Sequence, residues 1–174
     1  MSKQALLVID IQVGMFSESD PVYDGAALLG RINVLLHNAR TSGIPVIYVQ
    51  HNEGPGEQLE TETVAWEIHP SIAPEPEDTI IQKFMPDSFH ETSLQEVLSS
   101  RGIENLVIAG IQTDCCVNAT SRRAGELGYD ITVVEDAHST WGQGEKTAAE
   151  IIAEHNEQFQ KFAEIKKTQD ITFS

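Results

Sequence analysis

Three kinds of reactive side chain come shortly after short apolar runs of this sequence. Asp10 follows ALLVI, Lys83 follows TIIQ, and Cys115 and Cys116 follow NLVIAG. A carboxylate, an ammonium and a thiol can act together on a carbonyl carbon, because the ammonium favours the thiolate and the carboxylate moves protons. Each residue alone is weak evidence, since buried cysteines are often only structural. The hypothesis depends on a fold that brings the three together.

The two cysteines stand side by side in GIQTDCCVNATSRRAGELG, residues 110–128, where an apolar run meets a helical pattern. A thiol at a helix start is favoured as thiolate by free N–H groups and by the helix dipole. A vicinal disulfide or redox pair is an alternative, but the C-x-x-C spacing that would support it is absent. Adjacent side chains at a helix start point in different directions, so we expect at most one cysteine to face the site.

Alternating strand and helix patterns must position these residues. Short continuous runs rich in Val and Ile predict strands that are buried on both faces, as in a parallel sheet. Apolar residues at three- and four-residue spacing predict the helices. The expected strands are residues 5–9, 44–49, 79–81, 106–109 and 131–134, and the expected helices are residues 26–42, 92–101, 116–127 and 145–161.

This alternation predicts an α/β fold, a three-layer α/β/α sandwich around a doubly wound, mostly parallel sheet. With 174 residues and no shift in composition, we expect a single domain over residues 1–174. Right-handed crossovers place the carboxyl ends of all strands at one edge of the sheet, where ligands of such folds bind. Asp10, Lys83 and the cysteines are therefore expected to converge there.

Residues 51–78 interrupt the alternation, being rich in Gly, Pro and Glu without a sustained period. Long loops in compact domains are often lids or binding loops. A loose acidic insertion is the alternative. Trp66 and His69 favour the binding loop, because a large amphipathic ring in a polar segment usually packs against something.

The composition argues against several classes of partner. Eleven basic and 27 acidic residues give a net charge of −16, which repels nucleic acid and anionic membranes. Two cysteines and an N-terminus without signal-peptide features indicate a cytoplasmic protein. No apolar run approaches the length of a transmembrane helix. The expected partner is a small-molecule substrate.

The sequence indicates neither a metal nor a cofactor. The six histidines form no H-x-H, D-x-H or H-E-x-x-H cluster, and no glycine-rich phosphate-binding loop is present. His51, which directly follows an expected strand, is the one histidine expected at the working edge. The histidines are His37, His51, His69, His90, His138 and His155.

Several segments taken in order resemble the isochorismatase-like cysteine hydrolases, a family that includes nicotinamidases, N-carbamoylsarcosine amidohydrolase, ureidoacrylate amidohydrolases and isochorismatase. The resemblance covers about residues 5–140. It implies a Rossmann-like fold for the chain. It rests on ALLVIDIQVGMF, GIPVIYVQH, IIQKFMPDSF, LVIAGIQTDCCVNATSRRAGELGY and VVEDAHST.

The resemblance implies a catalytic triad of Asp10, Lys83 and Cys116, because the family's nucleophile precedes the Val of a G-x-x-T-D-x-C-V motif. It also implies a cis peptide bond between Ile111 and Gln112. The backbone N–H groups of Gln112 and Cys116 would form the oxyanion hole. Cys115 is then a packed neighbour.

The D-x-H metal site of nicotinamidases is missing from QHNEGPG, which argues against a metal-assisted nicotinamidase. The retained cysteine favours hydrolysis of a non-peptide C–N bond in an amide, ureido compound or lactam. Two alternatives stay open: a vinyl ether hydrolase that uses Asp10 as acid, and a non-catalytic metabolite-binding member of the family. The resemblance also implies a homodimer or homotetramer.

The walls of the substrate pocket are a further expectation. Aromatic and histidine side chains near strand ends suit a small planar substrate. On this ground the expected wall residues are Phe16, His51, Trp66 and Phe89.

Overall fold

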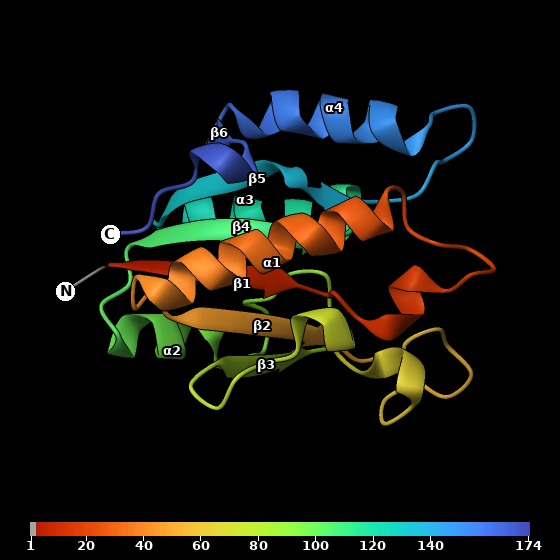
Figure 1. Ribbon diagram of the computed structural model, residues 1–174, viewed down its shortest axis with the longest axis horizontal. Helices are drawn as coiled ribbons and strands as arrows, with labels where there is room; N and C mark the ends of the chain where they lie inside the picture. The colour runs from red at the N-terminus through yellow and green to blue at the C-terminus, as the bar shows by residue number, and fades with distance from the viewer. Residues whose placement is uncertain (1–2) are drawn as a thin grey trace.

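The computed structural model describes residues 3–174, and its strands form one parallel sheet (Figure 1). The order across the sheet is β3-β2-β1-β4-β5-β6, and every neighbouring pair is parallel. The sheet confirms all five expected strands and the doubly wound topology. The strands are β1 Gln4–Ile9, β2 Val46–His51, β3 Thr79–Lys83, β4 Asn105–Ile111, β5 Asp130–Ser139 and β6 Glu164–Lys166.

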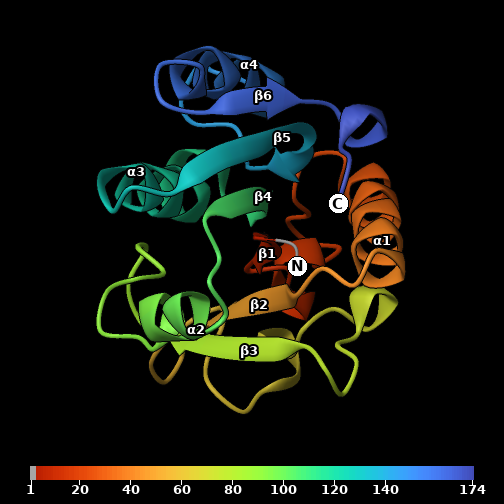
Figure 2. The same cartoon turned by 90° about the vertical axis from the view of Figure 1, so that its left-hand side faces the viewer.

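Within residues 3–174, four α-helices cover the two faces of this sheet (Figure 2). They are α1 Gly25–Thr41, α2 Leu94–Ser100, α3 Asn118–Glu126 and α4 Ala148–Phe159. All four were expected, with small differences at their ends. The last helix begins at residue 148 rather than 145, because Thr147 forms a capping box with Glu150.

The core consists of two layers of apolar side chains, one on each face of the sheet. Along β1, Leu6 and Val8 point to the cluster that includes α1, whereas Leu7 and Ile9 point to the cluster that includes α2, α3 and α4. Because successive side chains of a strand point to opposite faces, burial on both faces requires a continuous apolar run. This arrangement confirms the three-layer sandwich.

Among the described residues, β6 is the one strand that the sequence did not predict. It has three residues, Glu164–Lys166, of which none is fully buried. A run this short and this polar gives no recognisable strand pattern.

The strand order reverses between β1 and β4, the switch point where open α/β sheets bind ligands. There the two strands approach closely, because Ile9 pairs with Gly110. Gly110 has a φ of 145°, and a Cβ atom on it would lie 2.2 Å from the carbonyl oxygen of Ile9. Position 110 of β4 therefore requires glycine, the residue without a side chain.

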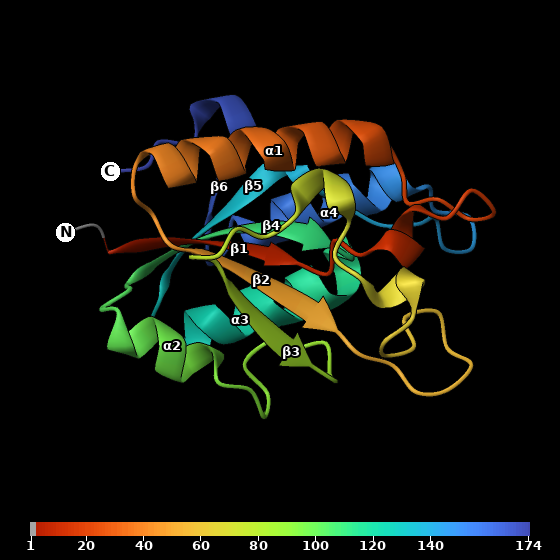
Figure 3. The same cartoon turned by 60° about the horizontal axis from the view of Figure 1, so that its bottom comes forward.

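Residues 51–78 leave β2 on the side to which the strand arrows point (Figure 3). The segment contains single 3-10 turns at Val64–Trp66 and Pro70–Ile72, and Leu59 and Ile72 are buried. Ile68 also forms a bridge with Gln12. The segment is packed onto the molecule, contrary to the alternative of a loose insertion. Within residues 3–174, no helix has the length and apolar character needed to cross a membrane.

Candidate active site

Asp10, Lys83 and Cys116 meet at the carboxyl edge of the sheet. Asp10 directly follows β1, Lys83 ends β3, and Cys116 lies in the π-helical turn Thr113–Val117 between β4 and α3. Lys83 Nζ lies 3.1 Å from Asp10 Oδ2 and donates to Cys116 Sγ at 3.4 Å. All three residues are buried. The fold thus brings together the three side chains that the sequence selected.

The carboxyl group of Asp10 is poorly satisfied for a buried group. Among the described residues, neither oxygen has a well-aligned hydrogen bond, although Lys83 Nζ lies close enough for an ion pair. Burial raises the pKa of Asp10 well above its ordinary value, and the neighbouring Cys116 raises it further, against the opposing effect of Lys83. A carboxylate in this setting binds a proton readily.

The pKa of Cys116 is raised, contrary to the lowering expected from Lys83 and the helix start. A hydrogen bond with Cys115 raises it most, burial raises it further, and Lys83 only partly offsets both. The same contact lowers the pKa of Cys115 to about 7. Cys116 therefore holds its proton at rest, and its activation requires transfer of that proton to a base. Asp10, whose carboxylate is electrostatically coupled to the Cys116 thiol, is the adjacent base.

The turn before Cys116 begins with a cis peptide bond between Ile111 and Gln112, as the resemblance implied. The carbonyl oxygen of Gln112 accepts from the N–H groups of Cys115 and Val117. These two bonds fix the backbone of the turn on both sides of Cys116. The Asp114 carboxylate accepts from Thr140 and from Gln143. The oxyanion-hole role of the Gln112 and Cys116 N–H groups stays a prediction.

Of the four expected pocket residues, the structure brings His51 to the expected triad, where its Nδ1 lies 2.8 Å from Lys83 Nζ. The ring of Phe16 packs edge-on against His69, and that of Phe89 stacks against Tyr129. Trp66 donates its indole N–H to Asn52 Oδ1. For Phe16, Trp66 and Phe89, a place in the substrate pocket stays a prediction.

Sequence reasoning missed a network of amide side chains at the base of the 51–78 segment. The buried Asn52 donates to the carbonyl oxygen of Lys83 and to Gln82 Oε1. Gln82 donates in turn to Gln50, which donates to the carbonyl oxygen of Trp66. The only signal in the sequence was that Asn52 is a polar residue directly after a buried strand. A single sequence does not distinguish such a residue from an ordinary loop residue.

His138 is a second residue whose role was missed. Asn156 Nδ2 donates to the Glu135 carbonyl, so its Oδ1 faces His138 Nε2 at 2.7 Å. Nε2 must then carry the proton, and Nδ1 accepts from the Thr113 hydroxyl at 2.7 Å. A neutral imidazole thus holds the first residue of the cysteine-bearing turn.

The wild-type protein should lose stability as the pH falls below about 6.5, because His138 is buried neutral. Burial lowers the pKa of His138 to about 4, whereas an unfolded histidine titrates near 6.5. The unfolded state therefore binds the proton first, and this residue alone should lower the unfolding free energy by about 2 kcal/mol between pH 7 and pH 5. Urea unfolding at pH 7 and at pH 5 measures this change in the unfolding free energy.

The His138→Gln variant is the control, since it removes the titrating group. We expect it to be less stable at pH 7, because it loses ring contacts, but to show a smaller decrease between pH 7 and pH 5. Comparing variant with wild type also removes the contribution of Asp10, whose raised pKa acts in the opposite direction. An identical decrease in both proteins would show that His138 does not titrate in this range.

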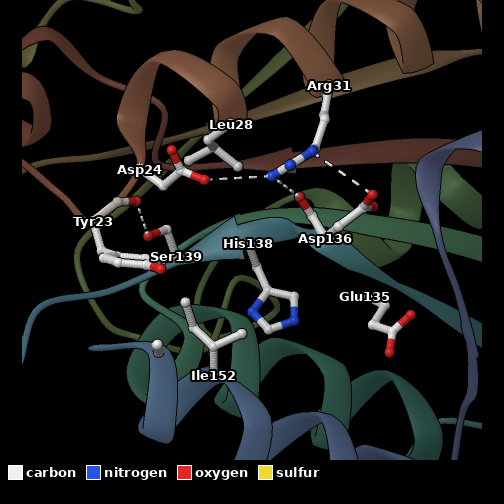
Figure 4. A pocket seen from close by; sticks show the side chains of 10 residues that line it. Tyr23, Asp24, Leu28, Arg31, Glu135, Asp136, His138, Ser139 and Ile152 are labelled. Atoms are coloured by element: carbon white, nitrogen blue, oxygen red, sulfur yellow. Dashed lines mark hydrogen bonds and ion pairs between the residues drawn. The ribbon is translucent and has the colours of Figure 1, made fainter. Parts of the chain in front are cut away.

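His138 also lines a cavity of about 250 Å³ between α1, β5 and α4 (Figure 4). Arg31 forms two ion pairs beside this cavity: its Nη1 lies 3.8 Å from Asp24 Oδ2, and its Nε lies 3.7 Å from Asp136 Oδ2. None of the three triad residues lines this cavity. Its lining residues are Tyr23, Asp24, Leu28, Arg31, Glu135, Asp136, His138, Ser139, Ala149 and Ile152.

Potential metal ligands are dispersed in the part of the chain that the structure describes. Residues 3–174 contain no group of three or more His, Cys, Asp or Glu side chains placed to hold a metal ion. At the triad, the cationic partner of Asp10 is Lys83.

Residues 4–170 match the isochorismatase domain. The chain belongs to the isochorismatase family. Solved structures agree: an isochorismatase from Pseudomonas putida KT2440 has a TM-score of 0.92 at 30% identity, covering 97% of this chain and 90% of its own. N-carbamoylsarcosine amidase from Thermoplasma acidophilum has a TM-score of 0.83 at 25% identity, covering 98% and 99%.

Curated relatives of this isochorismatase-family chain carry several names. Streptothricin hydrolase of Streptomyces noursei is 36% identical over 138 residues, covering 79% of this chain and 50% of the relative, so the chain spans about half its length. The uncharacterized isochorismatase family protein YddQ of Bacillus subtilis is 39% identical, covering 78% and 77%. Ureidoacrylate amidohydrolase RutB of Pseudomonas syringae is 30% identical, covering 76% and 69%.

Proposed function

We propose that this isochorismatase-family chain is a cysteine-dependent hydrolase that cleaves a non-peptide C–N bond in an amide, ureido compound or lactam. The observation that carries the proposal is the position of Lys83 Nζ, 3.1 Å from Asp10 Oδ2 and 3.4 Å from Cys116 Sγ in a buried site. The names of an amidase and an amidohydrolase among the similar proteins support the same reaction class.

The first half of the reaction forms a thioester. Asp10 takes the proton of Cys116 as Sγ attacks the carbonyl carbon, and Lys83 stabilises the negative charge as it moves between the carboxylate and the sulfur. The N–H groups of Gln112 and Cys116 donate to the oxyanion of the tetrahedral intermediate, an effect worth about 3 kcal/mol per donor in known hydrolases. Collapse of this intermediate breaks the C–N bond, and Asp10 returns the proton to the leaving amine.

The second half releases the product and restores the thiol. Asp10 takes a proton from water as the water oxygen attacks the thioester carbonyl. The C–S bond then breaks, the acid leaves, and Cys116 Sγ recovers the proton from Asp10. The raised pKa of Asp10 suits this exchange, because burial makes the carboxylate a better proton acceptor than an exposed one.

A second candidate is a vinyl ether hydrolase in which Asp10 acts as the acid. The raised pKa of Asp10 favours it, because burial stabilises the protonated form of the carboxyl, which is the form that can protonate a substrate carbon. That reaction needs no sulfur nucleophile, so Cys116 would be dispensable.

A screen of small amides, ureido compounds and lactams for release of ammonia or amine tests the proposal. Under quenched conditions, intact-mass and fragment-ion spectra should show the acyl group on Cys116 and not on Cys115. We expect the same rates with and without added zinc. An acyl group on Cys115, or turnover that requires zinc, would contradict the proposal.

A further inference from the structure

His51 touches the catalytic lysine more closely than either expected triad partner does. It ends β2 and pairs in register with Lys83 at the end of β3. Its Nδ1 lies 2.8 Å from Lys83 Nζ, whereas Asp10 Oδ2 lies at 3.1 Å and Cys116 Sγ at 3.4 Å. The ammonium therefore has three close partners from three different elements: hydrogen bonds to His51 and Cys116 and an ion pair with Asp10.

The chemistry of the ammonium fixes the state of the imidazole. An ammonium group has only donors, so His51 Nδ1 must be an acceptor and the ring must be neutral, with its proton on Nε2. Nε2 faces Glu53 Oε1 at 3.9 Å. With 16% of its side chain exposed, His51 lies between the fully buried Lys83 and the solvent-facing segment that follows β2.

The backbone of His51 is also held from the β1 side. Gln12, which is fully buried, accepts from the His51 N–H at 3.0 Å and donates to the His51 carbonyl at 2.9 Å. Gln12 lies two residues after Asp10, so one short stretch of chain places both Asp10 and the residue that holds His51. The backbone from which the imidazole projects therefore cannot shift without breaking these bonds.

We propose that His51 is a positioning residue: its neutral Nδ1 accepts from Lys83 and holds the ammonium between Asp10 and Cys116, and protonation of His51 releases that hold. The proposal rests on the proposed function only in taking Cys116 as the nucleophile. A protonated ring would direct an N–H at the ammonium, so Lys83 would lose an acceptor and meet a like charge.

The charged groups around His51 favour the neutral ring. Lys83 faces it from β3, Asp10 from the end of β1 and Glu53 from its own segment, while Cys116 lies on the far side of Lys83. Burial lowers the pKa of His51 below 6.5, and Lys83 lowers it further, against a smaller opposing effect of Asp10. The ring is therefore an acceptor at neutral pH and titrates on the acid side.

Alkylation of Cys116 by iodoacetamide tests the proposal without a substrate. The wild type is compared with His51→Asn, whose Oδ1 supplies an acceptor near the position of Nδ1, and with His51→Leu, which has none. Fragment-ion spectra separate Cys116 from Cys115. At pH 7 we expect Cys116 of the Leu variant to react about tenfold more slowly, because Lys83 loses a charge-assisted hydrogen bond and is no longer held beside Cys116. The Asn variant should stay within about threefold of wild type.

The pH dependence separates positioning from simple packing. As the pH falls from 7, the ratio of the Asn rate to the wild-type rate should rise, because only the wild type protonates its acceptor. A Leu variant that reacts like the wild type, or a constant ratio, would overturn the proposal.

Nitrogen-15 NMR of His51 keeps this test separate from the proposed function. At pH 7 it should show an unprotonated Nδ1 and a protonated Nε2, with the Nδ1 shift changed in Lys83→Met. That pattern in a protein that hydrolyses nothing would count against the proposed function alone. A protonated Nδ1 would overturn the role of His51, even in an active hydrolase.

Discussion

Replacing Cys116 by Ala should lower the turnover of any amide substrate found for this chain by at least about 10,000-fold. The substitution removes the atom that attacks the carbonyl, and hydrolases that lose their nucleophile retain only what binding and the oxyanion hole supply. Asp10 and Lys83 would remain in place, because their ion pair does not depend on the sulfur. Steady-state kinetics on the best substrate of the screen measure the effect.

Cys115→Ala is the matched control, since it removes a thiol from the adjacent position. We expect turnover within about tenfold of wild type, because Cys115 modulates the pKa of Cys116 without taking part in bond formation. A Cys116→Ala variant with full activity would exclude the thioester mechanism and favour Asp10 acting as an acid on a vinyl ether.

Gly110→Ala should destabilise the protein by more than about 4 kcal/mol or prevent folding. The new Cβ would meet the Ile9 carbonyl oxygen at 2.2 Å, and both atoms belong to backbone held by the β1–β4 pairing. The φ of 145° is also unfavourable for alanine. Relief requires separating β1 from β4, which costs ladder hydrogen bonds and core packing. Urea unfolding followed by circular dichroism measures the change.

Gly30→Ala provides a control of opposite sign. Gly30 lies inside α1, it is exposed, and a Cβ there meets nothing within 4 Å. Alanine in a helix interior should stabilise the protein by about 0.5–1 kcal/mol. If the Gly110 and Gly30 variants were equally stable, the close approach of β1 and β4 would not be the constraint that the geometry indicates.

The convergence of Asp10, Lys83 and Cys116 could be predicted from the sequence, because topology places all three at one edge of the sheet, and their catalytic roles stay a prediction. Asp10, Lys83 and Cys116 follow strands that are recognisable from their apolar runs, and parallel strands with right-handed crossovers end at one edge. The resemblance to known hydrolases then chose between the adjacent cysteines. The polar, three-residue β6 left no such pattern and was missed.

The proton affinities at the site could not be predicted in the same way. The raised pKa of Cys116 depends on a hydrogen bond with Cys115 and on the depth of burial, which exceed the effect of Lys83 only at the actual distances. The contact between His51 and Lys83 likewise depends on the register of β2 against β3. Side-chain geometry of this kind is set by packing and has no counterpart in residue spacing.

The amide network around Asn52 anchors the base of the 51–78 segment, whereas the tip of the segment, residues 54–58, lies outside this network. Asn52 is tied to Lys83, Gln82 and Trp66, whereas residues 54–58 are exposed, and a Cβ on Gly54 or Gly56 would meet nothing within 4 Å. A substitution at Gly54 should therefore leave the anchors and the distances among Asp10, Lys83 and Cys116 unchanged, whereas Gly56 has a φ of 83° and Gln58 donates to the Gly14 carbonyl. Mutations at the exposed, unstrained positions of this tip can therefore accumulate in related sequences without moving Asp10, Lys83 or Cys116.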